Sequence, residues 1–376
     1  GATPGQGLVT AVIAGFLISA LGGSRFQIGG PTGAFVVVVY GVIARYGYDG
    51  LLLATLMAGL MLYFTHLARF GTWIKYIPDA VVTGFTIGIG VIIATSQIKD
   101  LFGLDMAEVP AEFLDKWHGF WLARDTIDPS SVTIAAGALA LIIGLRKYAP
   151  KVPGFLVAVI LASLIVALAG LPVDTIGSRF GGIPSSIPMP ALPAISVDRI
   201  VELMPSAFTI AFLAGVESLL SAMVADGMTG RRHRSNGELV AQGIANSVSA
   251  LVGGLPATGA IARTATNIRS GARTPVAGML HAVFLLAFML VAAPLASFIP
   301  LASLAAVLVW FAWDMSEIER FRQLMSAPLG DRLVLLTTFG LTVLVDLTVA
   351  IEVGVVLAAV LFMHRMSEVV AIGQPS

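Results

Sequence analysis

Two short segments of this sequence are built to start a helix abruptly. Residues 29–34 read Gly-Gly-Pro-Thr-Gly-Ala and residues 253–260 read Gly-Gly-Leu-Pro-Ala-Thr-Gly-Ala, each ahead of an apolar run. Glycine and proline disfavour a continuous helix through either segment. A helix that begins there directs its free N–H groups and the positive end of its dipole at whatever lies in front of it. Two such N-termini facing each other predict an anion site, and kinks that only permit close helix packing are the alternative.

Two charged residues stand near these segments in otherwise apolar surroundings. Glu217 has apolar residues on both sides, and a carboxylate at that depth is usually functional or a structural hydrogen-bond partner between helices. Arg263 follows the second segment by one helical turn, where a full positive charge would add to the partial charge of the helix N-terminus. The alternative for Arg263 is an ion pair with Glu217 that never touches a substrate.

The expected site therefore combines backbone from both segments with these two charges. We expect Glu217 to carry a proton as well as to line the site. The residues predicted to contact the substrate are Thr32, Gly33, Ala34, Glu217, Ala260, Ile261, Ala262 and Arg263. No Walker loop, His-Glu-x-x-His or Gly-x-Ser-x-Gly pattern occurs, so neither ATP-driven transport nor an enzyme is predicted, and no cofactor or metal is expected.

The amino-acid composition indicates the class of protein in which these residues lie. Hydrophobic residues make up 57% of the 376 and charged residues only 12%, about half of the roughly 25% typical of soluble domains. The net charge is zero, which argues against nucleic acid as a partner because phosphate binding needs a basic surface. Cysteine is absent, which excludes disulfides and thiol chemistry. The lipid bilayer is the expected environment, and the apolar stretches are expected to be helices.

The apolar pattern predicts thirteen membrane segments and one surface helix. Several segments are shorter than the roughly 20 residues that a helix needs to cross a bilayer, so they are candidates for broken helices. The surface helix is expected at 113–122. The membrane segments are 8–21, 32–44, 50–67, 79–98, 130–145, 153–170, 205–225, 238–252, 257–268, 275–298, 301–313, 332–345 and 348–366.

The chain contains an internal repeat. The pattern at residues 8–23 recurs at 239–254, an offset of 231, and Thr-Gly-Ala at 32–34 recurs at 258–260, an offset of 226. The predicted units are 1–198, which lacks the counterpart of segment 205–225, and 199–376. An odd number of spans per unit inverts the second unit, as in many secondary transporters. With that topology most of the 22 lysine and arginine residues fall on the cytoplasmic side, and so does the C-terminus.

Four motifs resemble the sulfate permease (SulP) family of anion transporters, especially its bacterial members. They are Gly-Gly-Pro-Thr-Gly-Ala at 29–34, Glu-Ser-Leu-Leu-Ser-Ala at 217–222, Gly-Glu-Leu-Val-Ala-Gln-Gly-Ile-Ala-Asn at 237–246 and Thr-Gly-Ala-Ile-Ala-Arg-Thr at 258–264. The resemblance implies an all-α polytopic membrane protein with a uracil-permease-like, seven-plus-seven inverted repeat and two broken half-helices. It also implies a core domain, 1–68 plus 199–297, that moves against a gate domain, 69–198 plus 298–376.

This sequence departs from the family pattern in three ways. The family's first helix and the cytoplasmic STAS domain have no counterpart here. Sodium-coupled bicarbonate members have a hydroxyl residue where this chain has Ile261, and without that oxygen a Na⁺ site is harder to build. Proton coupling through Glu217 is therefore favoured. The bacterial inner (plasma) membrane is the expected location, and a homodimer is left open.

The sequence thus predicts a secondary transporter of a small anion, in the dicarboxylate, bicarbonate or sulfate class. A nucleobase permease of the same fold is one alternative, but it typically needs an acidic residue on the segment at 257–268, which contains neither Asp nor Glu. An anion channel or voltage-sensitive motor protein is the other.

Overall fold

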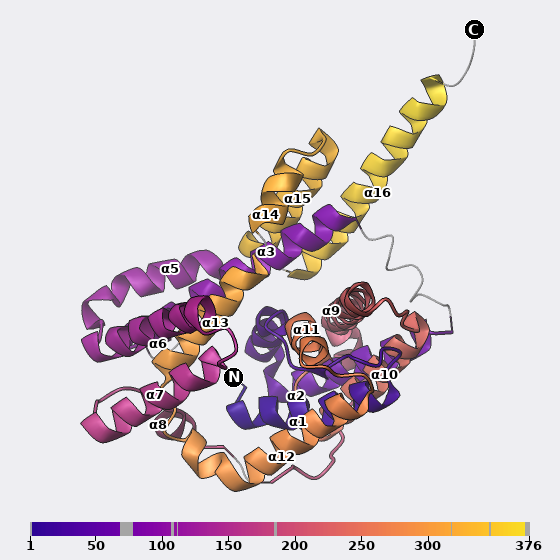
Figure 1. The fold of residues 1–376 in the computed structure, drawn as a ribbon. Helices are drawn as coiled ribbons and strands as arrows, with labels where there is room; N and C mark the ends of the chain where they lie inside the picture. Colours follow the sequence, from indigo (N-terminus) through magenta and orange to yellow (C-terminus); the bar gives the residue numbers. More distant parts are fainter. Residues whose placement is uncertain are drawn as a thin grey trace. The chain divides into compact units, whose positions relative to one another are not determined.

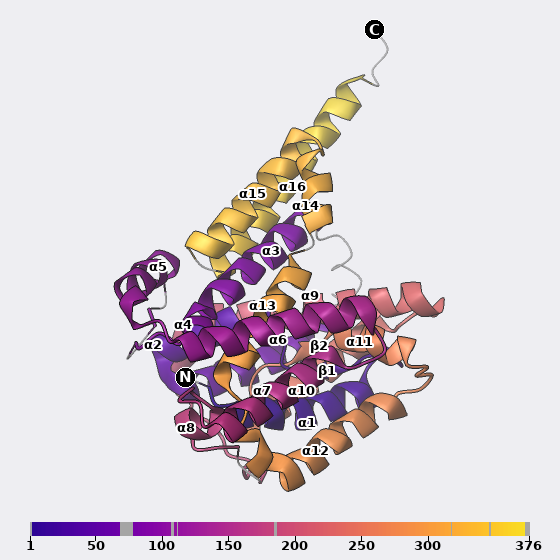
Figure 2. The ribbon, with the colours of Figure 1, turned by 60° about the vertical axis from the view of Figure 1, so that its left-hand side comes forward.

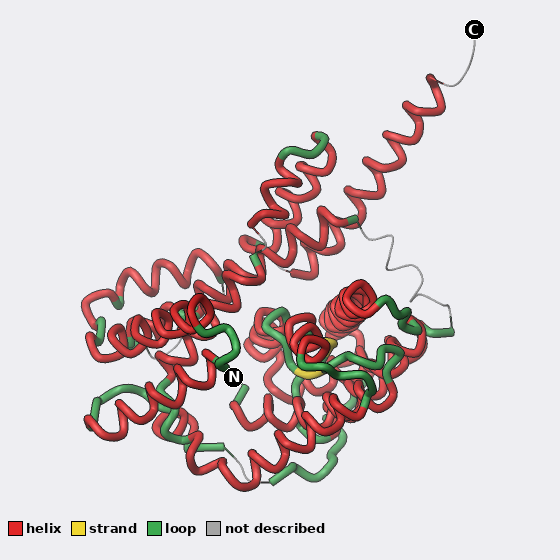
Figure 3. The backbone as a smooth tube through the Cα atoms, viewed as in Figure 1, coloured by secondary structure: helices red, strands yellow, loops and turns green. Residues whose placement is uncertain are grey.

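The computed structural model describes residues 2–67, 78–106, 109–110, 112–183, 186–316, 318–345 and 347–372. Helices dominate these residues, and the strands among them are two short segments that pair with each other (Figure 3). The chain divides into two compact units, which are described separately. Unit 1 comprises Gly1–Lys75, Asp100–Gly103 and Ile127–Val307, and unit 2 comprises Tyr76–Lys99, Leu104–Thr126 and Leu308–Ser376.

Unit 1 contains both broken segments. Its helices and strands are α1 (Pro4–Leu21), β1 (Gly29–Gly30), α2 (Phe35–Thr65), α6 (Pro129–Tyr148), α7 (Gly154–Ala169), α8 (Ile176–Phe180), α9 (Val197–Thr229), α10 (Ser235–Leu251), β2 (Thr258–Gly259), α11 (Ile261–Arg269) and α12 (Val276–Ala296). Helix α1 runs beside α12 (Figure 1, Figure 2), and α2 packs on α9 and α10. Two helices contain residues of both units: α4 (Ile98–Phe102) and α13 (Leu301–Met315).

A single glycine divides α2 into the two helices that the sequence predicts there. Gly47 has φ 72° and ψ 177°, so the helix is interrupted at this residue although the segments on both sides are helical. Residues with a side chain rarely adopt this positive φ, whereas glycine does so readily. The predicted segments 32–44 and 50–67 therefore correspond to the two arms of α2.

Helix α9 is longer than the predicted segment 205–225 because it continues through Pro205. Proline has no N–H and leaves the carbonyl four residues earlier without its helical partner. That residue is Val201, whose side chain is 67% exposed, so the interruption falls on an open face of the helix. The remaining predicted membrane segments each overlap a helix, which confirms the all-helical class.

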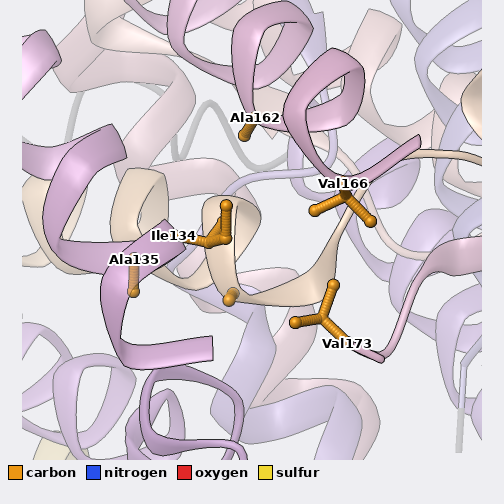
Figure 4. Close-up of a cluster of buried hydrophobic side chains, with 6 residues drawn as sticks. Ile134, Ala135, Ala162, Val166 and Val173 are labelled. Atoms are coloured by element: carbon orange, nitrogen blue, oxygen red, sulfur yellow. The ribbon is translucent and has the colours of Figure 1, made fainter. Parts of the chain in front are cut away.

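Apolar side chains hold α6 and α7 together. Ile134 and Ala135 of α6 pack against Ala162 and Val166 of α7, with Val173 from the following segment closing the cluster (Figure 4). All five side chains are less than 9% exposed. These small and branched residues form one of the buried clusters of unit 1.

Unit 2 packs three helices around a second apolar core. Its elements are α3 (Asp79–Ser96), α5 (Phe113–Leu122), the 3₁₀ turn η3 (Arg124–Thr126), α14 (Ile318–Met325), α15 (Leu329–Leu344) and α16 (Leu347–Ile372). Side chains of α3, α15 and α16 form the core: Ala80, Val81, Val334, Leu335 and Ala358. The helix predicted at 113–122 is confirmed as α5, and Trp117 and Trp121 on it are exposed.

Seven helical stretches in the described part of the chain are long and apolar enough to cross a membrane. They are Pro4–Leu21, Phe35–Thr65, Asp79–Phe102, Pro129–Tyr148, Val197–Thr229, Val276–Ala296 and Leu301–Met325. Shorter apolar helices lie at Gly154–Ala169 and Glu352–Leu361. The repeat boundary at 198 and the core and gate division stay predictions, and the core boundary after residue 68 lies outside the described residues.

Glycine lets α2 and α10 approach until their backbones touch. A Cβ at Gly243 of α10 would lie 2.6 Å from the Tyr63 nitrogen and 2.8 Å from the Gly59 oxygen of α2. A Cβ at Gly59 would in turn lie 2.8 Å from the Gly243 oxygen. Backbone atoms cannot move aside as a flexible side chain can, so the interface tolerates no larger residue at either position.

We therefore expect Gly243→Ala to lower the free energy of unfolding by about 1–3 kcal/mol, measured as thermal unfolding in detergent. Gly137→Ala on α6 is the matched control, because its Cβ meets nothing within 4 Å. The control should stabilise by about 1 kcal/mol or less through helix propensity. Equal stability changes in the two variants would contradict the proposed close contact.

Candidate functional site

The two broken segments meet as a short antiparallel ladder. Strand β1 pairs with β2 in the register Gly29 with Gly259 and Gly30 with Thr258. The ladder is extended by the Ala260 nitrogen, which donates to the Ile28 oxygen at 2.9 Å. Backbone that has left the helical conformation is thus satisfied across the two segments, as a protein-buried segment in a membrane requires.

Side chains of α11 fix the approach to β1. The Ile28 nitrogen donates to the Thr264 hydroxyl at 3.1 Å, and the Asn267 amide donates to the Phe26 oxygen at 2.9 Å. Thr264 is completely buried and also accepts from the Ser221 hydroxyl of α9 at 3.1 Å. The first broken segment is therefore held by the helix that follows the second one.

The approach to β2 is held by α9 and α10. Asn246 of α10 bonds the backbone of Ala257 in both directions, donating to its oxygen at 2.9 Å and accepting from its nitrogen at 2.8 Å. The Thr258 hydroxyl donates to the Ala214 oxygen of α9 at 2.9 Å. These contacts explain why an extended segment can persist between two helices.

Neither helix that follows the ladder has a side-chain cap. Ala260, the N-cap of α11, is extended, with φ −95° and ψ 112°, and Ala34 precedes α2 without a capping side chain. The N–H groups of the first turn of a helix have no partner within it. At the start of α2, however, the Phe35 and Val36 nitrogens donate to the Thr32 and Gly33 oxygens at 3.2 and 3.1 Å. Ile261 is 41% exposed and Ala262 is exposed in unit 1, so this end of α11 is open.

Glu217 and Arg263 reach neighbouring residues of the first segment. The Thr32 hydroxyl donates to Glu217 Oε2 at 3.0 Å, and Arg263 Nη2 donates to the Pro31 oxygen at 2.6 Å. No ion pair within 4.0 Å joins Arg263 to a carboxylate among the residues that the structure describes. The two opposite charges therefore stand beside Pro31 and Thr32 without neutralising each other directly.

All eight predicted site residues lie in unit 1. Thr32, Gly33 and Ala34 precede α2, Ala260 to Arg263 open α11, and Glu217 reaches Thr32 from α9. The structure holds no ligand, so substrate contact by these residues stays a prediction. In the described part of the chain no group of three or more His, Cys, Asp or Glu side chains could hold a metal ion.

A second buried carboxylate was not predicted as part of the site. Glu238 of α10 is completely buried and accepts hydrogen bonds from Gln27 and Ser218, the residue next to Glu217. The available signal was the spacing of Glu238 and Gln242, one helical turn apart at the start of an apolar segment. Only the fold shows that Gln27, more than 200 positions earlier, joins them.

Helices of membrane-crossing length, interrupted at two paired segments with uncapped N-termini, define a polytopic membrane protein built like a transporter. A profile described as the sulfate permease family matches residues 1–338. The chain belongs to this family of membrane anion transporters, so it is a multi-pass membrane protein and not an enzyme. The predicted family resemblance is confirmed.

Two curated relatives are similar over nearly the whole chain. "Putative sulfate transporter YvdB" of Bacillus subtilis (strain 168) is 46% identical over 370 residues, which cover 98% of this chain and 70% of YvdB. "Bicarbonate transporter BicA" of Picosynechococcus sp. is 32% identical over 377 residues, covering 98% of this chain and 66% of BicA. The chain thus spans about two thirds of the length of these relatives.

Solved structures share the fold. The transmembrane domain of a cyanobacterium bicarbonate transporter BicA superposes with a TM-score of 0.82 at 29% identity, covering 95% of this chain and 90% of that domain. Murine Slc26a9, an anion transporter solved in the inward-facing state, superposes with a TM-score of 0.85 at 16% identity. The superposition covers 96% of this chain and 64% of the Slc26a9 chain. The second likeness concerns the fold alone.

Gly30 leaves the space that the Arg263 guanidinium occupies. Its φ is 148°, and a Cβ there would lie 2.7 Å from Arg263 Nη1. Gly30→Ala should displace the guanidinium from the Pro31 oxygen and weaken anion binding on the order of tenfold, measured by calorimetry with a panel of small anions. Gly271→Ala is the control, because Gly271 also has a positive φ, 91°, but its Cβ meets nothing within 4 Å. Equal loss of affinity in both variants would argue against an effect through Arg263.

Proposed function

We propose that this chain is the membrane domain of a secondary active transporter that binds a small anion in front of the β1–β2 ladder. The observation that carries the proposal is the pairing of β1 with β2, which holds two uncapped helix N-termini at one place. The positive ends of the two helix dipoles attract an anion, and the first-turn N–H groups of α11 add donors. Thr32, Gly33, Ala34, Ala260, Ile261 and Ala262 supply the lining backbone.

The substrate class follows from this site and from the relatives. Sulfate, bicarbonate and dicarboxylates are small anions with oxygen acceptors that backbone N–H groups can bind. The printed names of the relatives mention sulfate for YvdB and bicarbonate for BicA. A nucleobase is disfavoured because α11 offers no carboxylate to a neutral ring.

Transport is proposed to occur by alternating access within a seven-plus-seven inverted repeat. The proposed repeats are residues 1–198 and 199–376. A core of 1–68 and 199–297, which contains both broken segments, would move against a gate of 69–198 and 298–376. Broken helices at a repeat interface are the usual substrate site of such transporters.

Glu217 is proposed to couple this movement to a proton. Its carboxylate lies within unit 1 and bonds to Thr32, next to the proposed anion position, and no cation neutralises it among the described residues. A carboxylate in the membrane that can gain or lose a proton there changes the charge of the site by one unit. Proton uptake with the anion would reduce the negative charge that the moving core carries.

The decisive experiment is uptake into proteoliposomes. Labelled sulfate, bicarbonate, a dicarboxylate such as succinate, and uracil would each be offered with and without an imposed pH or Na⁺ gradient. Saturable uptake of one or more anions, accelerated by an inward proton gradient, is expected. Uptake of uracil alone, or no anion uptake above empty liposomes, would overturn the proposal, and a steady conductance in electrical recordings would identify a channel instead.

Glu217→Gln should abolish the acceleration by a proton gradient, because the amide keeps the size and the hydrogen bonding of the side chain but cannot titrate. Glu202→Gln is the matched control, since Glu202 is an exposed carboxylate on the same helix. Initial uptake rates at several imposed pH gradients measure the effect. A Glu217→Gln protein that still responds to the gradient like wild type would exclude Glu217 as the proton carrier.

Arg263→Ala should weaken anion affinity by roughly tenfold to a hundredfold, the value of one charge-assisted contact of about 1.5–3 kcal/mol. Arg269→Ala serves as control, because Arg269 is exposed in the last turn of the same helix. Calorimetric titration with the transported anion measures the change.

Combining Arg263→Ala with Glu217→Gln separates the two roles predicted for the arginine. Additive losses of affinity are expected if both residues act on the substrate. Tighter binding by the double variant than by Arg263→Ala alone would show that Arg263 serves mainly to balance Glu217.

A further inference from the structure

A fully buried carboxylate lies behind the proposed site and is not used by the mechanism above. Glu238, in the first turn of α10, is 0% exposed, and no Lys, Arg or His of the described residues lies within 4.0 Å of its oxygens. Neutral donors surround it instead. They are the nitrogens of Gly23 at 2.9 Å and Ser24 at 3.3 Å, the amides of Gln27 at 2.8 Å and Gln242 at 3.2 Å, and the hydroxyl of Ser218 at 3.0 Å.

Ser218 is the centre of this group of residues. Its hydroxyl accepts from the Gln27 amide and from the Gln242 amide, each at 2.6 Å, and donates to Glu238 Oε1. A hydroxyl has one proton and two acceptor lone pairs, so all of its hydrogen-bonding capacity is used. The rotamer of Ser218, and with it the rotation of this turn of α9, is specified by three partners on other segments.

The same residues lie next to Glu217 and to both strands of the ladder. Ser218 follows Glu217 directly, and Gln27 stands two residues before β1. The Gln27 side chain also lies against β2, because a Cβ on Gly259 would collide with its amide. A shift of Ser218 or Gln27 would therefore move Glu217 relative to Thr32 and disturb the ladder.

We propose that Glu238 and Ser218 are positioning residues, which set where the Glu217 carboxylate and the β1–β2 ladder stand and so tune anion affinity and proton coupling without touching the anion. This inference rests on the proposed function for its transport readouts, although the positioning itself can be measured without a substrate. A carboxylate suits this task because it accepts several hydrogen bonds at once and binds each donor more tightly than a neutral acceptor does.

The central variant is Ser218→Ala, which removes the hydroxyl and leaves the backbone donors of Glu238 in place. Ser218→Cys is a second variant of similar volume with weaker hydrogen bonds. Ser303→Ala is the matched control, because Ser303 is equally buried and its hydroxyl donates only to the Pro300 oxygen, at 2.8 Å.

The first readout is hydrogen exchange by mass spectrometry in detergent, which needs no substrate. Amides of peptides covering residues 24–34 and 255–264 should exchange on the order of tenfold faster in both Ser218 variants than in wild type or Ser303→Ala. Unchanged exchange in these peptides would overturn the proposal whether or not the protein transports an anion.

The second readout is anion uptake by the same proteins. Ser218→Ala should raise KM on the order of tenfold and alter the pH profile of uptake, with a smaller change in maximal rate. Its effect should be non-additive with that of Thr32→Ala, since both act on Glu217. A Ser218 variant that loses thermal stability but keeps the wild-type KM and pH profile would show a merely structural role and overturn the proposal. Failure of wild type to take up any anion would count against the proposed function alone.

Discussion

Backbone that leaves the helix in a membrane protein must still find hydrogen-bond partners, and this single requirement organises unit 1. The chain meets it by pairing the two interrupted segments with each other, from Ile28 to Ala260. Polar side chains nearby serve the same end: Thr264 and Asn267 fix the approach to β1, and Asn246 fixes the approach to β2. Several polar side chains therefore gather around the four strand residues and satisfy the backbone on either side of them.

This arrangement also separates the charges of the site. The Glu217 carboxylate and the Arg263 guanidinium bond to consecutive residues, Thr32 and Pro31, but not to each other. An ion pair would have satisfied both charges and left little for a substrate. Held apart by neutral backbone and hydroxyl partners, each would respond separately in the proposed mechanism, Arg263 to an anion and Glu217 to a proton.

The helices could be predicted from the sequence because apolar length and glycine or proline interruptions are local signals. The break that separates the predicted segments 32–44 and 50–67 falls at Gly47, where a positive φ requires glycine. The extension of α9 through Pro205 could not be predicted, because it depends on which face of the helix is open. The role of Glu238 could not be predicted either. In the sequence it is a polar residue at the end of a membrane segment, and only the fold shows that Gln27 and Ser218 donate hydrogen bonds to it.

The register of the ladder constrains how the proposed site can change shape. Gly29 pairs with Gly259 and Gly30 with Thr258, and the Ala260 nitrogen donates to the Ile28 oxygen, so backbone joins the segments that lead into α2 and α11. Neither strand can move away from the other without breaking these backbone hydrogen bonds. In the proposed transport cycle the two helix N-termini would therefore move together, because separating them would break the ladder.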